Sequence, residues 1–454
     1  MAMTSDADLL ITGGTVVTMD EERRLLPSGW IAIAGNRIVG VGPGGAPDSP
    51  WRPKRRIDAT GMLVMPGLVS CHGHACNSLV RGMAEDRPLH EWLTEVLWPA
   101  MSHAGADEVY RGALLSAVEM LRSGVTCFAD MWTEVPSTAR AVAEVGLRAL
   151  LAYNLRDFGD GERTAIEIDR AVRAWRECDG LGDGRIRVGL GPHSIYACTP
   201  EMLRRARRIA SEHGLVLQIH VSETRREFEQ SVERHGLSPI AYLDRMGFLG
   251  PDVIAAHVVW LGDGDLDILR RREVSVAHCV ASNLKLGSGV APVRDFRNAG
   301  VVVGVGTDGP ASNNSLDILA DLKIAALLHK GVGHVPREMP AADVVAMATV
   351  DGAAILGLGD ELGRLAPGYL ADVILVDATG PHFAPFHAHD PAQTYAHLVY
   401  SAKSTDVRTV IVDGQVRMLD GAITGLDEKS VIDGAQQASS RILVAAGLLP
   451  SAAQ

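Results

Sequence analysis

The sequence predicts an α/β protein: a (β/α)₈ TIM barrel with a small composite β-sandwich domain formed by the N- and C-terminal segments. Two observations lead to this fold class. About eight short apolar runs alternate with helical patterns through the middle of the chain, and β-like segments lie at both ends. The length of 454 residues alone would suggest three domains, but a barrel with insertions accounts for most of such a chain.

The β-like segments at the two ends share one texture. From Leu9 to Ile57, short apolar runs are interrupted by Gly and Asn at turn positions. The same pattern returns in residues 369–378 and 407–418, where Asp413-Gly414 predicts a hairpin turn. We therefore expect one composite domain of residues 1–62 and 362–425.

Residues 63–361 carry the alternation that predicts the barrel. Strand-helix alternation is typical of parallel strands, and eight of them favour a closed barrel over an open sheet. No GxGxxG motif follows the first strand, which weakens a dinucleotide-binding alternative. Residues 426–454 read as a final amphipathic helix and tail. The predicted strands are MLVMPGLV, VTCFAD, LRALLAYNL, RIRVGLGP, LVLQIHV, VIAAHV, VSVAHC and VVVGVGTD.

Composition excludes several classes of partner. The formal net charge is −12, so a field that would gather nucleic acid is absent. No run reaches the roughly 20 apolar residues of a membrane span, and the N-terminus has no signal-peptide pattern. The six cysteines are scattered, which fits a reducing cytoplasm. We expect a soluble cytoplasmic protein with small-molecule partners; a homo-oligomer is left open.

Histidines end several predicted strands. His72 and His74 end the first, His220, His257 and His278 end later strands, and Asp308 ends the last. The carboxyl ends of parallel barrel strands converge on one mouth, where the active sites of this fold are built. His72 and His74 are two residues apart in an extended segment and point to the same side.

Each of these residues alone is often structural, but the joint pattern predicts a metal site. Three imidazoles and a carboxylate suit a borderline divalent ion such as Zn²⁺, with Fe²⁺ as the alternative. Such an ion lowers the pKa of bound water to about 7. The predicted ligands of this single ion are His72, His74, His220 and Asp308.

A family resemblance adds to this interpretation. The strings PGLVSCHGH, QIHVSE, IAAH and GTDGPASNN match, in order, the motif series of the amidohydrolase superfamily. Longer strings, among them LVRGMAEDRPLHEWL and GPHSIYACTP, look like the S-adenosylhomocysteine/5′-methylthioadenosine deaminase group. The resemblance implies a barrel with a composite β-domain and one catalytic metal.

The same resemblance implies roles for further residues. Glu223 and His257 match the family's proton-transfer residues, with Asp308 both ligand and catalytic. Glu91 and Trp92 match a pair that reaches the ribose and the base, and His193 matches the histidine of its GPHS segment.

Some positions depart from the family pattern. Gly73 replaces a larger residue between the first two histidines, and HCVASN stands where HNPASN is usual. Tyr153 aligns with an arginine associated with the 5′ substituent of the nucleoside, and Arg156 or Arg163 are its candidate substitutes. We therefore expect uncharged 5′ groups to be accepted at least as well as a homocysteine moiety.

Other residues have structural interpretations. His278 is expected to support the site, and Ser312, Asn313 and Asn314 to shape the loop after Asp308. The His387-x-His389 pair is interpreted as part of a loop.

The predicted function is hydrolytic deamination of a 5′-substituted adenosine: methylthioadenosine, S-adenosylhomocysteine or adenosine. An alternative keeps the machinery and changes the ring to guanine, 8-oxopurine, pterin or s-triazine, with amine or chloride leaving. A remote alternative is a barrel that has lost catalysis. Ammonia release and metal content distinguish these possibilities.

Overall fold

The computed structural model describes residues 5–45, 51–83 and 85–450. Its chain divides into two compact units. One contains Met1–Ser70, Met120–Cys127 and Asp317–Leu426, and the other contains Cys71–Glu119, Phe128–Leu316 and Asp427–Gln454. The domain boundaries expected from the sequence stay a prediction.

The terminal segments form one mixed sheet, as expected. Its strands are β1 (Ser5–Val17), β2 (Leu25–Ala34), β3 (Arg37–Gly42), β4 (Trp51–Asp58), β5 (Met62–Pro66), β14 (Val373–Asp377), β15 (Val407–Val412), β16 (Gln415–Leu419) and β17 (Ala422–Ile423). Within this sheet the N-terminal segment joins the C-terminal segment through the antiparallel pairing of β5 with β14. Asp413 and Gly414 join β15 to β16 with φ of 54° and 73°, the left-handed conformation of a type I′ hairpin turn.

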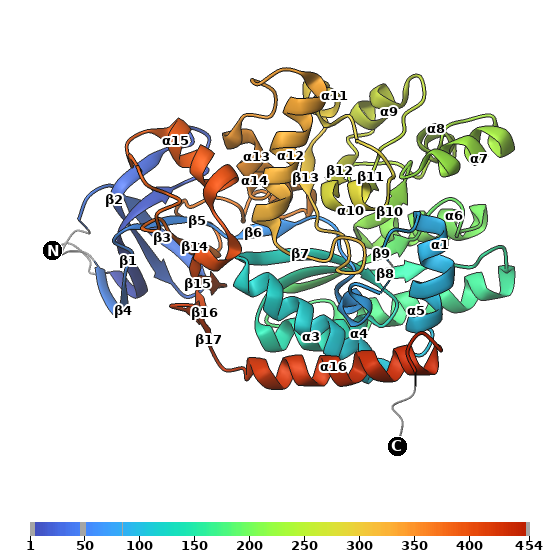
Figure 1. Cartoon of the computed structure of the whole chain (residues 1–454), viewed down its shortest axis with the longest axis horizontal. Coiled ribbons are helices and arrows are strands. Elements are labelled where there is room, and N and C mark those ends of the chain that lie inside the picture. The colour runs from blue at the N-terminus through green and yellow to red at the C-terminus, as the bar shows by residue number, and fades with distance from the viewer. Residues whose placement is uncertain (1–4, 46–50, 84, 451–454) are drawn as a thin grey trace. The chain divides into compact units, whose positions relative to one another are not determined.

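The barrel sheet has eight strands in sequence order, and Figure 1 follows them through the chain. The paired strands whose register is resolved run parallel. The strands are β6 (Leu68–Ser70), β7 (Val125–Trp132), β8 (Arg148–Leu155), β9 (Ile186–Pro192), β10 (Leu217–Val221), β11 (Val253–His257), β12 (Ser275–His278) and β13 (Val303–Val305).

The barrel closes beside the predicted metal ligands. The backbone N–H of Cys71 donates to the Val305 carbonyl at 2.8 Å, and the backbone N–H of Asp308 donates to the His72 carbonyl at 3.2 Å. Gly306 permits this approach because a Cβ there would lie 2.8 Å from the His72 nitrogen. Closure therefore places the first and last strand ends side by side.

The first predicted barrel strand is divided in the structure. MLVMPGLV splits at Gly67 into β5, in the mixed sheet, and β6, in the barrel. A Cβ at Gly67 would lie 2.1 Å from Thr126 Oγ1, so this close approach requires glycine. The apolar pattern is continuous because both sheets bury their strands.

Helices connect the barrel strands and, after β13, lead along the chain to β14 of the mixed sheet. They are α3 (Ala106–Arg122), α4 (Val135–Val145), α5 (Gly161–Cys178), α6 (Pro200–His213), α7 (Arg225–His235), α8 (Pro239–Arg245), α9 (Asp265–Arg271), α10 (Val280–Lys285), α11 (Val293–Asn298), α12 (Ile318–Gly333), α13 (Ala341–Met347) and α14 (Val350–Ile355). Shorter elements are η1 (Ala75–Val80), α1 (Leu89–Trp92), η2 (Leu93–Leu97), α2 (Trp98–Met101), α15 (Pro391–Ala396), η3 (His397–Ser401) and η4 (Ser404–Asp406).

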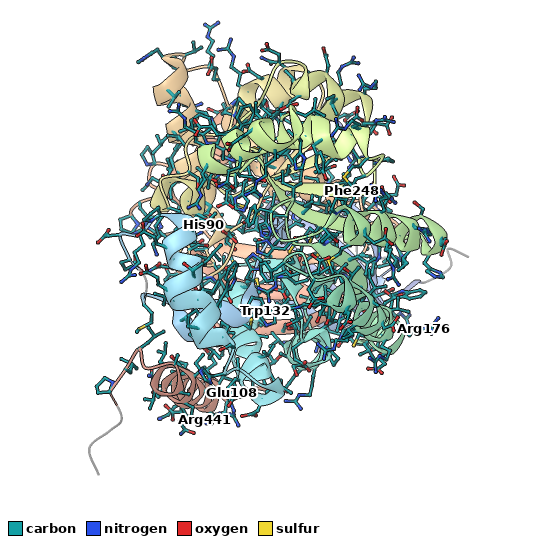
Figure 2. All side chains as sticks on the ribbon, turned by 90° about the vertical axis from the view of Figure 1, so that its right-hand side faces the viewer. His90, Glu108, Trp132, Arg176, Phe248 and Arg441 are labelled. Atoms are coloured by element: carbon teal, nitrogen blue, oxygen red, sulfur yellow. The ribbon has the colours of Figure 1, made fainter. Side chains whose placement is uncertain are left out.

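The predicted final helix is α16 (Glu428–Ala445). Its Arg441 pairs with Glu108 of α3 at 2.8 Å, and Figure 2 labels both residues. Apolar side chains of α16 also share a buried cluster with the segment from α1 to α2. Across the described part of the chain, no helix has the length and apolarity needed to cross a bilayer.

Candidate metal-dependent active site

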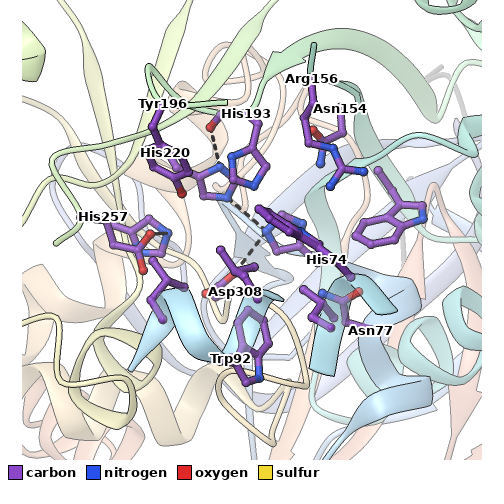
Figure 3. A pocket seen from close by; sticks show the side chains of 16 residues that line it. His74, Asn77, Trp92, Asn154, Arg156, His193, Tyr196, His220, His257 and Asp308 are labelled. Carbon is purple, nitrogen blue, oxygen red and sulfur yellow. Dashed lines mark hydrogen bonds and ion pairs between the residues drawn. The ribbon is translucent and has the colours of Figure 1, made fainter. Parts of the chain in front are cut away.

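The four predicted metal ligands converge at the carboxyl ends of the barrel strands, as Figure 3 shows for His74, His220 and Asp308. His72 and His74 follow β6, His220 lies in β10, and Asp308 follows β13. The Nε2 atoms of His72 and His74 lie 3.6 and 3.4 Å from Asp308 Oδ1. The parallel bridge between Gly73 and Asp308 fixes this proximity through the backbone.

Hydrogen bonds to Nδ1 assign the tautomers of the three histidines. Nδ1 of His74 faces the Met131 carbonyl at 2.8 Å, and Nδ1 of His220 faces the His193 carbonyl at 2.7 Å. Nδ1 of His72 faces Gln218 Oε1 at 2.6 Å. Because oxygen acceptors require an N–H donor, Nδ1 carries the proton in each ring and Nε2 presents a lone pair.

The lone pairs of His74 and His220 face one another, and this arrangement fits a bound metal ion. Nε2 of His74 and Nε2 of His220 are 3.1 Å apart, although neither has a proton to share. Burial, followed by the neighbouring imidazoles, lowers the pKa of His72 to about 3 and that of His220 well below its usual value. Neutral imidazoles arranged in this way suit a divalent cation placed between them.

Asp308 supplies the negative charge of the cluster. Its Oδ2 accepts hydrogen bonds from Ser282 at 2.6 Å and Ser312 at 2.8 Å, which leaves Oδ1 facing the histidines. Burial acts to raise the pKa of Asp308, but the adjacent imidazoles and the Ser282 hydroxyl hold it below its usual range. Asp308 is therefore an ionised carboxylate.

Two groups of donor atoms lie close enough to share an ion. The donor atoms of His72, His74 and Asp308 lie within 4.8 Å of one another, and so do those of His72, His220 and His257. The donor set of imidazole nitrogen and carboxylate oxygen suits a zinc-like ion. Because the donor atom of His257 lies within 4.8 Å of those of His72 and His220, His257 could also coordinate the ion.

Glu223 and His257 lie together beside the cluster. Their Oε2 and Nε2 atoms are 3.8 Å apart, and both side chains are buried. His257 Nδ1 faces Asn283 Oδ1 at 2.8 Å, which orients the ring. Burial raises the pKa of Glu223, and for His257 the effect of burial is outweighed by the negative charges of Glu223 and Asp308, which raise its pKa. For both groups the shift favours the protonated form.

The backbone at this mouth is unusually often left-handed. Ser222, His257, Val258 and Asp308 have φ of 54°, 75°, 45° and 59°. Residues other than glycine rarely adopt this conformation, and it costs about 1–3 kcal/mol when the surroundings enforce it. Such outliers gather at functional sites, which agrees with the placement of these residues.

A cavity opens directly onto the cluster. It has an empty volume of about 460 Å³. Aromatic and apolar side chains line it together with polar and charged groups. Its lining consists of His74, Asn77, Leu89, Trp92, Leu93, Leu97, Trp98, Trp132, Asn154, Arg156, His193, Tyr196, His220, Glu223, His257 and Asp308.

The structure separates the expected substrate contacts. Trp92 and His193 line this cavity, whereas Glu91, Tyr153 and Arg163 are not in its lining. Tyr153 is buried and donates its hydroxyl to Glu167 at 3.0 Å, so it does not present itself to a ligand.

A second cavity accounts for one of the two candidate arginines. It has an empty volume of about 920 Å³ and shares Trp98, Trp132 and Arg156 with the first cavity. Arg163 lines this second cavity, and Arg156 lies between the two. Arg156, which the sequence offered only as a substitute for the missing arginine, is therefore the arginine of the first cavity.

Several supporting residues were missed by sequence reasoning. Gln218 lies two residues before His220 on β10, so strand periodicity could have placed it on the ligand face. Ser282 and Asn283 were quoted only as part of a string and hold Asp308 and His257. Ser312 was assigned to loop shape, yet it also bonds Asp308 directly.

Other histidines lie outside the metal cluster. His387 and His389 are exposed in the loop before α15, as predicted. Within the described residues, no possible metal-binding group includes them or His278.

Comparison with known proteins places the chain among hydrolases. The model of the Amidohydrolase family matches residues 63–417. The sequence is 44% identical over 437 residues to a 5-methylthioadenosine/S-adenosylhomocysteine deaminase from Pelotomaculum thermopropionicum, covering 96% of this chain and 99% of that protein. It is 43% identical over 434 residues to a 5′-deoxyadenosine deaminase from Methanothermobacter thermautotrophicus, covering 96% and 98%.

A solved structure agrees with these relatives. The fold is similar to that of an adenosine deaminase from Xanthomonas campestris with bound zinc, with a TM-score of 0.91 and 31% identity. The similarity covers 97% of this chain and 99% of the other. Both comparisons span nearly the whole chain.

Proposed function

The chain belongs to the amidohydrolase family, and from that membership we propose that it deaminates a 5′-substituted adenosine to the corresponding inosine and ammonia. The observation that carries this proposal is the cluster of three imidazole lone pairs and one ionised carboxylate beside the buried Glu223. The enzyme is a hydrolase acting on the C–N bond of a cyclic amidine.

The metal is proposed to be one Zn²⁺ per chain, held by His72, His74, His220 and Asp308. The zinc bound in the similar adenosine deaminase from Xanthomonas campestris supports zinc over Fe²⁺. When bound, such an ion lowers the pKa of a coordinated water to about 7, which makes hydroxide available at neutral pH.

The protein residues move the protons of the reaction. Asp308, whose Oδ2 accepts hydrogen bonds from Ser282 and Ser312, accepts a proton from the attacking water. Glu223 protonates the ring nitrogen next to the carbon that bears the amino group, which makes that carbon more electrophilic. His257 donates a hydrogen bond to the oxygen that the ring gains. The proton taken by Asp308 passes to the amino group, which leaves as ammonia, and the proton of the new hydroxyl group returns to Glu223.

The first cavity supports binding of a purine. Trp92 and Trp98 offer aromatic faces near the ion cluster. Burial, together with the positive charge of Arg156, lowers the pKa of His193 well below its usual value. A neutral His193 can exchange hydrogen bonds with the base.

The second cavity supports a substituent on the 5′ carbon. Arg156 lies at the junction of the two cavities. Within the described residues it forms no ion pair, and its buried Nε atom makes no hydrogen bond. A partly buried guanidinium that forms no ion pair favours an anionic ligand group. Arg156 therefore supports a second prediction, an anionic 5′ group, beside the preference for uncharged 5′ groups that Tyr153 suggested.

Glu91 keeps its proposed contact with the ribose hydroxyls as a prediction for the bound state. It lies next to Trp92 on α1, and its own side chain is exposed.

A reducing cytoplasm is proposed from the cysteine pattern alone.

A substrate screen tests the proposed function. Ammonia release is measured with adenosine, 5′-deoxyadenosine, methylthioadenosine, S-adenosylhomocysteine, adenine, guanine, a pterin and an s-triazine. We expect adenosine nucleosides to exceed the free bases, and Glu91→Ala to reduce nucleoside turnover more than adenine turnover. Turnover of guanine, pterin or triazine without any adenosine would replace the proposal with the other-ring alternative.

A further inference from the structure

We propose that Glu227 is a positioning residue that holds Glu223 in place for proton transfer. Glu227 lies in the first turn of α7, four residues after Glu223. This inference rests on the proposed function, because it assigns Glu227 a role only through the role of Glu223.

The contact between the two residues involves the backbone. The N–H of Glu223 donates to Glu227 Oε2 at 2.9 Å, and both residues are buried. The carboxyl group of Glu227 therefore acts on the peptide unit that carries Glu223, and the Glu223 side chain lines the cavity.

The other end of the same peptide unit is also fixed. The carbonyl of Ser222 accepts the N–H groups of Val259 and Trp260, each at 2.9 Å. Those donors lie two and three residues after His257 in sequence. The plane of the Ser222–Glu223 peptide is thus held on one side by the β11 loop and on the other by Glu227.

This peptide needs to be held because its conformation is costly. Ser222 has φ of 54°, in the left-handed region that a serine rarely adopts. Strain of this kind persists only where surrounding bonds enforce it. Removal of the Glu227 bond is expected to let Ser222 relax and to turn the Glu223 side chain away.

Helix capping alone does not explain the bond. Thr224 is the N-cap of α7, and its hydroxyl accepts the N–H of Glu227 at 3.2 Å. In a capping box the glutamate would return this contact to the N–H of the N-cap residue. Glu227 instead bonds the residue before the cap, which is Glu223.

The carboxyl group is kept at an energetic cost. Burial, with a further contribution from the charge of Glu223, raises the pKa of Glu227 to about 8, against the opposing effect of backbone N–H groups of Glu223 and Ser222. An apolar side chain of similar volume would avoid this desolvation cost if folding were the only requirement.

Three variants test the proposal. Glu227→Leu should lower kcat by about 10²-fold while KM and metal content stay near wild type, because misplacing a catalytic group by about 1 Å has effects of that size. Glu227→Gln keeps an acceptor oxygen and should recover most of the activity. Glu229→Leu is the matched control, since Glu229 is an exposed carboxylate on the same helix that pairs with Arg225.

A double-mutant cycle distinguishes positioning from general damage. On the Glu223→Gln background, Glu227→Leu should have almost no further effect on kcat, because residues that act as a unit are not additive. Glu227→Ala, measured in the same way, gives the test if the leucine variant does not fold.

The outcomes separate the two proposals. Wild-type kcat in Glu227→Leu, a Gln variant as weak as the Leu variant, or full additivity with Glu223→Gln would overturn the role of Glu227. A fully active Glu223→Gln, or a wild-type enzyme without deaminase activity, would instead contradict the proposed function.

Discussion

The proton on each histidine determines what the site can bind. Carbonyl oxygens of Met131 and His193 and the amide oxygen of Gln218 accept from Nδ1 of the three ligand candidates, so the lone pair of each ring is on Nε2. None of these acceptors is a metal ligand itself. Loss of such a partner would misorient a ring without removing it.

Glu223→Gln separates catalysis from metal binding. Glu223 is beside the cluster but is absent from both groups of candidate ligands, so the variant should keep its ion. Turnover should fall by about 10²-fold to 10⁴-fold, the usual effect of removing a general acid-base group. Metal analysis and kcat on the same preparation check this, and parallel loss of metal would contradict the assigned role.

Arg156→Met tests recognition of the 5′ substituent. If the guanidinium receives an anionic group, the variant should lose about 10-fold to 100-fold more kcat/KM with S-adenosylhomocysteine than with methylthioadenosine. This range corresponds to the roughly 1.5–3 kcal/mol of a charged hydrogen bond. Arg173→Met, an exposed arginine on α5, is the control. Equal losses for the two substrates would exclude the contact.

Strand ends explain why distant residues meet. Apolar runs and turn residues predicted the strands. Because the carboxyl ends of parallel barrel strands converge, the sequence also predicted that His72, His220 and Asp308 lie close together. The split at Gly67 could not be predicted, because a continuous apolar run is compatible with one buried strand or two. Close approaches such as this one depend on tertiary packing.

Gly306→Ala tests barrel closure as the support of the metal site. The new Cβ would lie 2.8 Å from the His72 nitrogen, so β13 and the end of β6 must move apart. We expect a loss of about 1–3 kcal/mol in the free energy of unfolding and weaker metal binding. Gly331→Ala, where a Cβ meets nothing within 4 Å, is the control. Unchanged metal affinity in Gly306→Ala would contradict this account.

His329 on α12 should make stability sensitive to acid. Burial lowers its pKa from 6.5 to about 4, so the folded state holds the neutral ring. Its contribution to stability is complete above pH 6.5 and is lost as the pH falls towards 4, because the unfolded chain takes up the proton first. The loss is on the order of 3 kcal/mol.

The matching measurement is the free energy of unfolding between pH 7 and pH 4. His329→Leu should show a shallower decline over this range than wild type, whatever its stability at pH 7. An identical slope for the two proteins would show that His329 does not titrate on unfolding.

Over the whole molecule, chemistry-bearing residues were more predictable than substrate contacts. The predicted metal ligands, Glu223 and His257 lie at or just after strand ends whose positions follow from periodicity. The sequence did not show whether Arg156 or Tyr153 faces the cavity. Both lie near the end of β8, where the alternation of side chains decides which residue points inward. Residues on loops, such as Glu91, carry no such periodic signal.

We propose that one bound divalent ion enables this protein to deaminate adenosine nucleosides. The most direct test removes metal by chelation and follows inosine-product formation while Zn²⁺ is added back in measured amounts. We expect no turnover in the metal-free protein and a linear rise that reaches its maximum at about one ion per chain. Full activity without metal, or no deamination of any adenosine by the fully loaded protein, would contradict the account.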